Sequence, residues 1–515
     1  MRIGFLFQDG HLRAWHARLT TALRTSPGVD ACVASLEAAP GGGGLRATSL
    51  ESLMLLERTL AGRERSWLAD TLRPSELAAL SQIDISADAT ARLGEGDMLL
   101  DLRARPDLLP VTPARVLTPT FDALSGEDAM WNRLLEGAAP RLGVADHGAI
   151  DAHTLALPAL QAPNRLLESA EAVLTHLVAA LARYVSTLAA GRTPPLFATT
   201  PPPGAAVEPD ALPPRLSASA APTLVRRLTT KLATKRDEIL KQAPTWQVAY
   251  RAAGMRTLAN ERLPHELFTL LPDDGQRYYA DPFVIAHDSW HHVFIEELPY
   301  ATGRGVISHF VIDRDGAASQ PRIVLEAPHH LSYPQVFRHD GQIWMLPEAS
   351  AAGRLDLYRA ERFPDRWVKH ATLIDEPLHD STFFTHGGRL WISAGMTLPG
   401  ASTWDTLALY HAERLDGPWT PHPMNPVLVD ARAARPAGEL YRLRGELWRP
   451  AQDCTGGYGS AVTLNRVDAL DEMQFRQTLV TTLSFGPTSS ARATHTLNYA
   501  RGIEVIDVFK PRQAQ

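Results

Sequence analysis

The pattern of apolar and polar residues changes character near residue 194. Before this point strand-like and helical runs alternate along the chain. The strand-like runs include residues 3–7, 31–36 and 98–102, and the helical runs include residues 12–23, 52–60 and 166–188. This alternation predicts an α/β domain with a mostly parallel sheet over residues 1–192. From about Trp246 the helical period disappears, and short alternating strands continue to residue 510.

Two segments of different composition connect these regions. Residues 193–222 are rich in proline and alanine and have no periodicity, which predicts an extended linker. Residues 223–241 combine a leucine stripe with many lysines and arginines, so a basic amphipathic helix and connector is expected over 223–245. We favour a bracing helix. A weak contact with an anionic membrane surface is the alternative.

The region 246–510 is internally repetitive. Five stretches read as a strand, a tight turn and a second strand: residues 280–297, 332–348, 379–395, 436–453 and 494–508. The turn glycines of the last four are Gly341, Gly388, Gly445 and Gly502, and Ser289 takes this place in the first. Further matching strands follow several hairpins, which predicts an all-β five-bladed propeller. The stretch "WQVAYRA" (246–252) is expected to close the ring.

Polar residues recur at one end of these hairpins. Counting back eight residues from the first three turns reaches Asp281, Tyr333 and Asp380. The returning strands and the later repeats are expected to bring further residues to the same end: Glu297, Glu348, Arg435, Arg449, Asp453 and His495. A single acid here can be a simple cap. Many carboxylates with few cations are costly together unless their pKa values separate or a ligand binds, which predicts a functional site.

The propeller region resembles known carbohydrate-active families. The stretches "ADPF" (280–283) and "SYPQVFRHDGQIW" (332–344) resemble the strand openings of glycoside hydrolase families 43, 32 and 68. More closely, residues 246–510 resemble the N-terminal propeller of glucosamine inositolphosphorylceramide transferases. The resemblance implies Asp281 as base or nucleophile and Asp380 or Glu348 as acid. Tyr333 stands where the hydrolases place a modulating acid, a departure that favours sugar binding or transfer over hydrolysis.

The N-terminal region resembles a formyltransferase-like, Rossmann-like domain. The resemblance rests on the opening strand–helix–strand, on "GDMLLDLR" (96–103) and on "FDALSGEDAMWNRLLEG" (121–137). Active members need an Asn, a His and an Asp close together. No Asn–x–His pair follows residue 101, and Asp146 and His147 have the wrong spacing. We therefore expect a catalytically degenerate domain.

Composition narrows the alternatives. A net charge of −6 provides no attraction to nucleic acid, and two cysteines cannot form a disulfide framework. The opening apolar run is too short for a signal peptide, and residues 166–188 carry charges, so a cytoplasmic protein is expected. The glycine-rich "CTGGYG" (454–459) lies between strands rather than before a helix, and the histidine pairs lack further ligands. No cofactor or metal is predicted.

The leading hypothesis is a carbohydrate-active protein of bacterial surface-glycan biosynthesis, either a glycosyltransferase or glycoside hydrolase-like. Its partners would be a sugar, nucleotide sugar or glycan and other glycan-assembly enzymes. Arg435 and Arg449 are expected to hold a phosphate or carboxylate by forked hydrogen bonds. A non-catalytic glycan- or protein-binding scaffold is the alternative, and a sugar N-formyltransferase is disfavoured.

Overall fold

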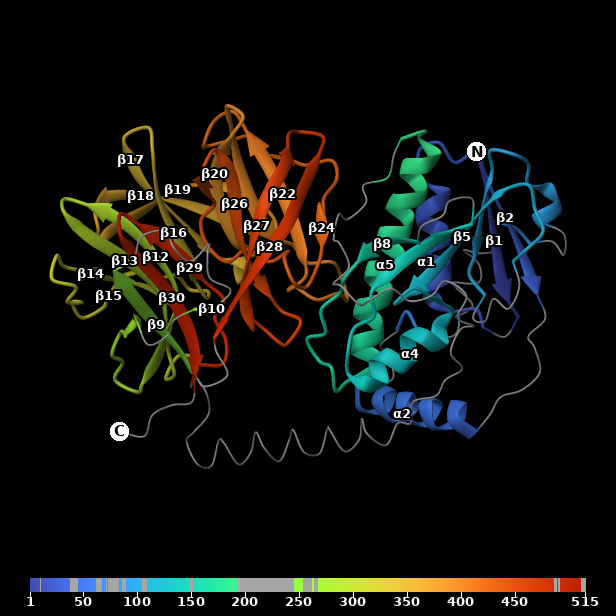
Figure 1. Ribbon diagram of the computed structural model, residues 1–515, viewed down its shortest axis with the longest axis horizontal. Coiled ribbons are helices and arrows are strands. Elements are labelled where there is room, and N and C mark those ends of the chain that lie inside the picture. Colours follow the sequence, from blue (N-terminus) through green and yellow to red (C-terminus); the bar gives the residue numbers. More distant parts are fainter. Residues whose placement is uncertain are drawn as a thin grey trace. The chain divides into compact units, whose positions relative to one another are not determined.

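The computed structural model forms two compact units, one N-terminal and one C-terminal (Figure 1). It describes residues 1–9, 11–37, 45–61, 67–70, 72, 83–85, 89–103, 109–147, 152–192, 194, 245–252, 262–263, 267–485, 489 and 491–510. The expected linker of residues 193–222, apart from residue 194, and the expected basic helix of residues 223–241 lie outside the described residues.

The N-terminal unit is built on one sheet with the strand order β3-β2-β1-β4-β5-β7-β8. These strands are β1 (Arg2–Gln8), β2 (Ala31–Glu37), β3 (Asp84–Ile85), β4 (Met98–Asp101), β5 (Arg115–Phe121), β7 (Leu142–Asp146) and β8 (Ala152–Ala156), with β6 (Leu124–Ser125) paired to β5. The first five strands of this order are parallel, and β7 is antiparallel to both of its neighbours, β5 and β8. The prediction of an α/β unit is confirmed, whereas the formyltransferase-like fold stays a prediction.

Helices pack around this sheet. They are α1 (Ala14–Arg24), α2 (Leu45–Ala61), α4 (Glu127–Glu136) and α5 (Leu166–Ala189), with a 3-10 turn η1 (Ala89–Arg92). Among the described residues α5 alone is long and apolar enough to span a bilayer, but 61% of its most apolar window is buried, as is typical of a core helix. The Glu57 carboxylate accepts hydrogen bonds from the first amides of α5, Leu166 (2.9 Å) and Leu167 (2.7 Å). It thereby supplies the helix cap that the local sequence lacks.

The C-terminal unit is a five-bladed propeller, as predicted (Figure 1). Blade one contains β12 (Arg277–His287), β13 (Trp290–Pro299), β14 (Val306–Ile312) and β15 (Arg322–Leu325). Blade two contains β16 (Ser332–His339), β17 (Gln342–Glu348), β18 (Leu355–Arg362) and β19 (Arg366–Ile374), with η4 (Ser350–Ala352) between β17 and β18. Blade three contains β20 (His379–His386), β21 (Arg389–Gly395), β22 (Thr406–Ala412), β23 (Thr420–Pro421) and β24 (Leu428–Val429). Blade four contains β25 (Tyr441–Leu443), β26 (Glu446–Asp453), β27 (Ala461–Leu470), β28 (Phe475–Phe485) and β10 (Arg262–Leu263).

Blade five closes the ring from both ends of the propeller sequence. It contains β29 (Leu497–Ala500), β30 (Ile503–Lys510), β9 (Thr245–Ala252) and β11 (Thr269–Leu270). Strand β9 pairs with β30 along its whole length, so the predicted closing strand is confirmed. It is the third strand of the blade, however, because β11 pairs with its outer edge. Strand β11 covers the outer edge of β9 at Ala249 and Tyr250.

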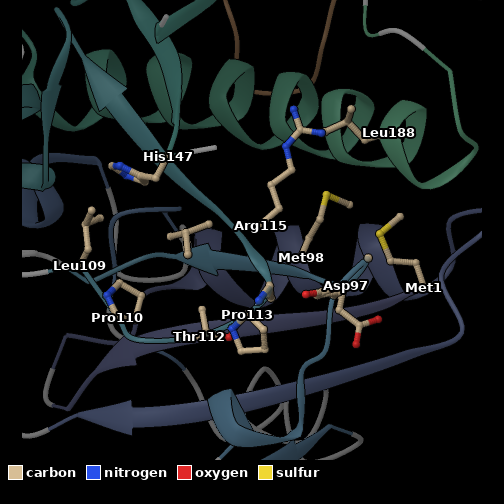
Figure 2. Close-up of a pocket in the computed structure, with 14 residues that line it drawn as sticks. Met1, Asp97, Met98, Leu109, Pro110, Thr112, Pro113, Arg115, His147 and Leu188 are labelled. Carbon is tan, nitrogen blue, oxygen red and sulfur yellow. Dashed lines mark hydrogen bonds between the residues drawn. The ribbon is translucent and has the colours of Figure 1, made fainter. Parts of the chain in front are cut away.

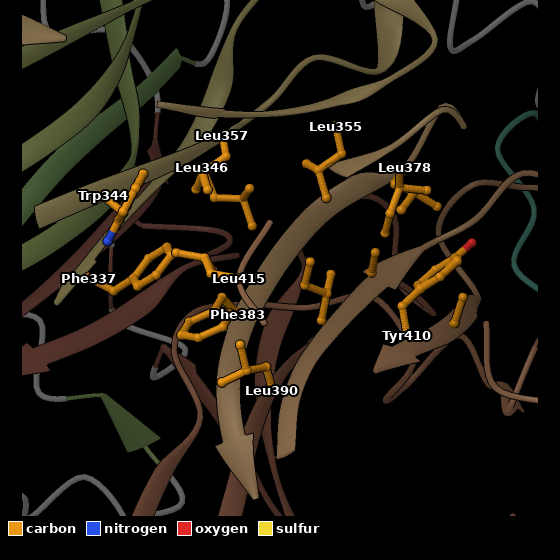
Figure 3. Packing of buried hydrophobic residues seen from close by; sticks show 14 residues of the cluster. Phe337, Trp344, Leu346, Leu355, Leu357, Leu378, Phe383, Leu390, Tyr410 and Leu415 are labelled. Carbon is orange, nitrogen blue, oxygen red and sulfur yellow. The ribbon is translucent and has the colours of Figure 1, made fainter. Parts of the chain in front are cut away.

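Apolar side chains fill the space between neighbouring blades. Figure 3 shows the cluster between blades two and three, where Phe337 stacks on Phe383 with ring centres 4.3 Å apart. The recurring tryptophans that follow the hairpin turns, Trp344, Trp391 and Trp448, are all buried. They belong to the core between blades, as expected, and do not form a sugar platform.

The inner hairpin of every blade has a two-residue turn. In all five turns both residues have positive φ, which is the type I′ geometry preferred by twisted hairpins. The second turn residue is glycine in blades two to five and Ser289 (φ +68°) in blade one. Residues can therefore be matched between blades by counting from these turns. In blade one the second turn residue, Ser289, has a strained backbone conformation.

We expect Ser289→Gly to stabilise the propeller by about 1 kcal/mol, since glycine removes the steric cost of the left-handed conformation. Urea or guanidinium unfolding measures the change. The matched control is Gly341→Ser, at φ +72° with open space around a new Cβ atom, which should lose a similar amount. Loss of stability in Ser289→Gly, or a neutral Gly341→Ser, would contradict this account.

Candidate functional site

Three inner strands start with the same distortion. Asp281, Tyr333 and Asp380 have φ values of +50°, +45° and +49°. Each lies at a register shift between the two inner strands of its blade. A bulge of this kind redirects a side chain, and non-glycine residues keep such a conformation only when the surroundings hold it. The residues predicted at the start of the inner hairpins of blades one to three therefore share one backbone conformation.

Hydrogen bonds from these strained residues connect neighbouring blades. The Asp281 amide donates to Asp507 Oδ2 (3.2 Å), the Tyr333 amide to Asp281 Oδ2 (3.1 Å) and the Asp380 amide to Glu348 Oε2 (2.8 Å). In each case the acceptor is a carboxylate of the preceding blade. These bonds gather the carboxylates of four blades at one end of the propeller and explain how the strained backbone is held.

The first group in this cluster is a histidine between two acids. His495 Nε2 lies 3.0 Å from Asp281 Oδ1, and His495 Nδ1 lies 3.0 Å from Asp507 Oδ2. Burial lowers the pKa of His495, but the charges of Asp507 and Asp281 raise it more, so that it ends well above its ordinary value. All three side chains are buried, and the raised pKa favours the cationic imidazole between the two acids.

The same three residues lie close enough to bind a metal ion, with ligand atoms within 4.8 Å of one another. Both ring nitrogens of His495 already face carboxylate oxygens, however, and a protonated imidazole has no lone pair to give. The three residues therefore fit two acids bridged by a protonated histidine better than they fit a metal centre.

The second group surrounds Asp380. Its Oδ2 accepts hydrogen bonds from Arg435 Nε (2.6 Å) and Gln452 Nε2 (2.8 Å). Burial raises the pKa of Asp380 well above its ordinary value, Arg435 opposes this, and the charges of Glu348 and Asp281 add to it. Burial lowers the pKa of Arg435, but Asp380 raises it more strongly, so the guanidinium stays charged.

Glu348 is the charged neighbour of Asp380. Its Oε1 accepts from Ser350 Oγ (2.7 Å) and lies 3.3 Å from His379 Nδ1. Burial alone would raise the pKa of Glu348. The hydrogen bond and charge of His379, the charge of Arg435 and the hydrogen bond from Ser350 outweigh burial, so the pKa lies below its ordinary value. Two neighbouring carboxyl groups thus have pKa values displaced in opposite directions, which distinguishes a proton-carrying acid from a permanent anion.

The structure brings Glu296, rather than the predicted Glu297, to the cluster. His330 Nε2 lies 3.1 Å from Glu296 Oε1, while Glu297 accepts from Ser308 Oγ (2.6 Å) and pairs with Arg277. Burial raises the pKa of Glu296, and the charge of Asp281 adds to it. The ladder explains the correction: it pairs Phe283 with Phe294, and beyond the bulge at Asp281 it pairs Ala280 with Glu296, so Glu296 lies next to the bulge and Glu297 lies one residue further along.

Arg449 and Asp453 also face away from the cluster. Arg449 forms a fork of hydrogen bonds, but to the carbonyls of Ala434 (3.0 Å) and Ala433 in the segment between β24 and β25, and burial lowers its pKa to about 9. Asp453 accepts from the amide and hydroxyl of Thr455. Side chains alternate along β26, so the residue that reaches Asp380 is Gln452.

Tyr333 occupies the centre with a neutral hydroxyl. That hydroxyl accepts a hydrogen bond from the Gly438 amide (2.6 Å) and lies 3.0 Å from Thr382 Oγ1. Burial raises its pKa well above the ordinary value. The position at which the hydrolases place a third acid is therefore occupied by a buried phenol, which connects blades two, three and four.

Three residues of the cluster were missed from the sequence: Asp507, His330 and His379. Counting from the turns reaches Glu296 and Gln452 together with the preferred Glu297 and Asp453, and it does not separate the neighbours. Asp507 had a usable signal, since an acid interrupts the apolar strand "IEVIDVF" and is fully buried. His330 and His379 had no such signal in the sequence, because only the carboxylate that lies beside each of them in the structure identifies them.

The N-terminal unit contains a separate cavity of about 610 Å³ (Figure 2). It lies at the amino ends of β4 and β5, where Met98 and Arg115 begin their strands. His147 lines it and lies 3.0 Å from Thr118 Oγ1, whereas Asp146 is bound by Arg115 Nε (2.8 Å). In open α/β sheets ligands bind outside the carboxyl ends of the strands, so this edge is not where formyl-transfer chemistry would be sought. The degenerate character of the unit stays a prediction.

Fold and site together define a five-bladed propeller with buried acid–base residues at one end of its axis. Residues 272–510 match the family model described as "Glucosamine inositolphosphorylceramide transferase 1, N-terminal". The transferase of that name from Oryza sativa subsp. japonica is 33% identical over 213 residues, which cover 40% of this chain and 29% of the relative. The Arabidopsis thaliana transferase is 33% identical over 240 residues, which cover 46% and 30%. The resemblance of the propeller to these transferases is confirmed, and the chain spans about 30% of their length.

The solved structures that this chain matches include glycoside hydrolases. Zg3597, a family 117 glycoside hydrolase from Zobellia galactanivorans, is 11% identical, and the match covers 52% of this chain and 91% of that chain with a TM-score of 0.34. The GH43_1 enzyme from Xanthomonas citri is 12% identical, with coverages of 47% and 89% and a TM-score of 0.35. Similarity at this level carries no argument about chemistry.

Proposed function

We propose that the propeller is carbohydrate-active, and that it binds a glycosyl unit at the acidic end of its axis and transfers or hydrolyses it. The opposite displacement of the pKa values of Glu348 and Asp380 carries this proposal. Glycosyl chemistry with two carboxyl groups needs one that is charged and one that is protonated. The match of the propeller to a transferase family supports a sugar as the substrate class.

Asp380 and Asp281 then act on the substrate, and the charge of Glu348 helps to keep the proton on Asp380. Asp380 gives its proton to the departing glycosidic oxygen. Asp281, paired with His495, acts as the nucleophile that bonds to the anomeric carbon as the leaving group departs. Alternatively it is the base that takes the proton of an acceptor hydroxyl, and the oxygen of that hydroxyl bonds to the anomeric carbon. We further propose that the substrate is a nucleotide sugar or a glycan. The protein would act with other enzymes of surface-glycan assembly in a bacterial cytoplasm. These two points rest on the resemblance alone.

A non-catalytic glycan- or protein-binding module is the second candidate. One observation favours it: both oxygens of Asp281 already accept hydrogen bonds or ion pairs from the protein, namely from Thr496 Oγ1 (2.9 Å), His495 and the Tyr333 amide. A carboxylate saturated in this way must exchange a partner before it can act on a substrate.

Turnover and binding of a panel of nucleotide sugars and glycans distinguish the two candidates. If the site is catalytic, Asp281→Asn and Asp380→Asn should each lower turnover by about 10²–10⁴-fold while binding remains. Asp468→Asn, on the outer part of β27 and bound to Arg466, is the matched control and should behave as wild type. Binding without turnover in the wild type would favour the module. Absence of any binding would overturn both.

A further inference from the structure

The glycine-rich loop of residues 454–459, "CTGGYG", presents an aromatic residue to the acidic cluster. The Tyr458 ring centre lies 5.2 Å from that of His495, and the Arg435 guanidinium carbon lies 5.1 Å from the same ring centre. Trp246 stands 4.1 Å from His495 by ring centres, and Trp404 stands 5.5 Å from Tyr458. These three aromatic residues, all half-buried, form what we call the aromatic wall: Trp246, Trp404 and Tyr458.

The loop is fixed in place against blade five. Asp453 binds both the amide (2.9 Å) and the hydroxyl (2.6 Å) of Thr455, and the Gly459 carbonyl accepts from the Thr494 amide (3.0 Å). Gly459 has a φ of +60°, and a Cβ atom there would lie 2.5 Å from the Cβ of His495. Glycine is therefore required for the loop to approach the cluster so closely, and no phosphate-binding role is needed to explain it.

The Tyr458 hydroxyl differs from the other phenols around the site. Tyr333 and Tyr278 each place their hydroxyl against a protein group, Gly438 and Glu296 respectively. Among the described residues, the Tyr458 hydroxyl has no hydrogen-bond partner. Because Tyr458 is only half-buried and its hydroxyl is not enclosed, a ligand can reach this hydroxyl and become its hydrogen-bond partner.

The chemistry of Tyr458 is that of a neutral hydrogen-bonding group. Burial raises its pKa well above the ordinary value, Arg435 opposes this, and the charges of Asp380, Asp281 and Glu348 add to it. A phenol that keeps its proton is a donor and a stacking surface, not a nucleophile. The two cations nearest Tyr458, Arg435 and His495, already lie against carboxylates, which favours a neutral sugar over an anionic one at this position.

We propose that Tyr458 is the residue that contacts the sugar ring, stacking on the apolar face of a neutral pyranose and hydrogen-bonding one of its hydroxyls. Trp246 and Trp404 flank that ring. This inference rests on the proposed function, which it deepens by naming the sugar class and the contact. Pockets that combine aromatic faces with a few fixed polar groups suit a ligand of this kind.

Titration of the full chain with neutral sugars tests this assignment. The probes are glucose, galactose, xylose and N-acetylglucosamine, each up to 100 mM, with intrinsic tryptophan fluorescence as the readout, since Trp246 and Trp404 adjoin the site. We expect saturable binding of at least one probe by the wild type. Tyr458→Phe, which keeps the ring, should weaken it about fivefold through loss of one neutral hydrogen bond. Tyr458→Ala should weaken it at least about tenfold.

The matched control is Trp290→Ala, an exposed aromatic residue beside the turn at the opposite end of blade one, which should bind as wild type. Thermal midpoints of all variants show whether the fold is kept. Unchanged affinity in Tyr458→Ala would overturn the assignment of Tyr458 while leaving the proposed function standing. Failure of the wild type to bind any neutral probe would also overturn it, and binding of a charged nucleotide sugar in the same variants would show that the proposed function survives.

Discussion

Replacement of Arg435 by methionine should destabilise the propeller by about 3–5 kcal/mol, which is the usual cost of removing one partner of a buried ion pair. Arg435 and Asp380 are 6% and 2% exposed and meet at 2.6 Å. Methionine keeps much of the volume but leaves the carboxyl group of Asp380 beside Glu348 and Asp281 without its counter-ion. Guanidinium unfolding at pH 7 measures the loss.

The double variant Arg435→Met/Asp380→Asn is the control for this mechanism. It should recover a large part of the loss, because asparagine needs neither a buried negative charge nor a bound proton at this position. The single variant should also lose less at acidic pH. Its Asp380 has an even higher folded-state pKa than in the wild type, so the penalty for ionising it grows as pH rises above the unfolded value of about 3.9. A single variant as stable as the wild type would show that the ion pair contributes nothing to the fold.

The second large effect is expected at His495. We expect His495→Gln to lose about 3–5 kcal/mol at pH 6, because Asp281 and Asp507 then face each other without the cation between them. The folded-state pKa of His495 is raised, so its contribution is fully present below the unfolded value of about 6.5 and is lost as pH rises through the folded value. The difference between wild type and variant should therefore narrow from pH 6 toward alkaline pH.

His309→Gln provides the matched control. His309 is also buried, and its Nε2 lies 2.9 Å from His292 Nδ1. Burial lowers its pKa to about 3, so it is neutral across this range, and its loss should cost the same at pH 6 and pH 9. A pH-independent loss in His495→Gln would contradict the imidazolium assignment.

Much of the propeller could be predicted because its determinants are local and repeated. A two-residue turn with positive φ needs glycine, and such a glycine marks four of the five inner hairpins. The alternation of apolar and polar residues on both sides then defines paired strands, and the spacing of the turns gives the number of blades. Asp281, Asp380 and Glu348 could be assigned to one end of the axis by counting from those turns alone.

The sequence by itself thus determined the two-part organisation, the five blades and the end of the propeller at which acids gather. Only the tertiary structure decided which acids meet. The register of β12 and β13 and the alternation along β26 selected Glu296 and Gln452 over their neighbours Glu297 and Asp453, since a shift of one residue turns a side chain to the opposite face. Contacts across blades, such as His495 between Asp281 and Asp507, set the protonation of each group, because a pKa depends on burial and on charges that the chain brings together from distant positions.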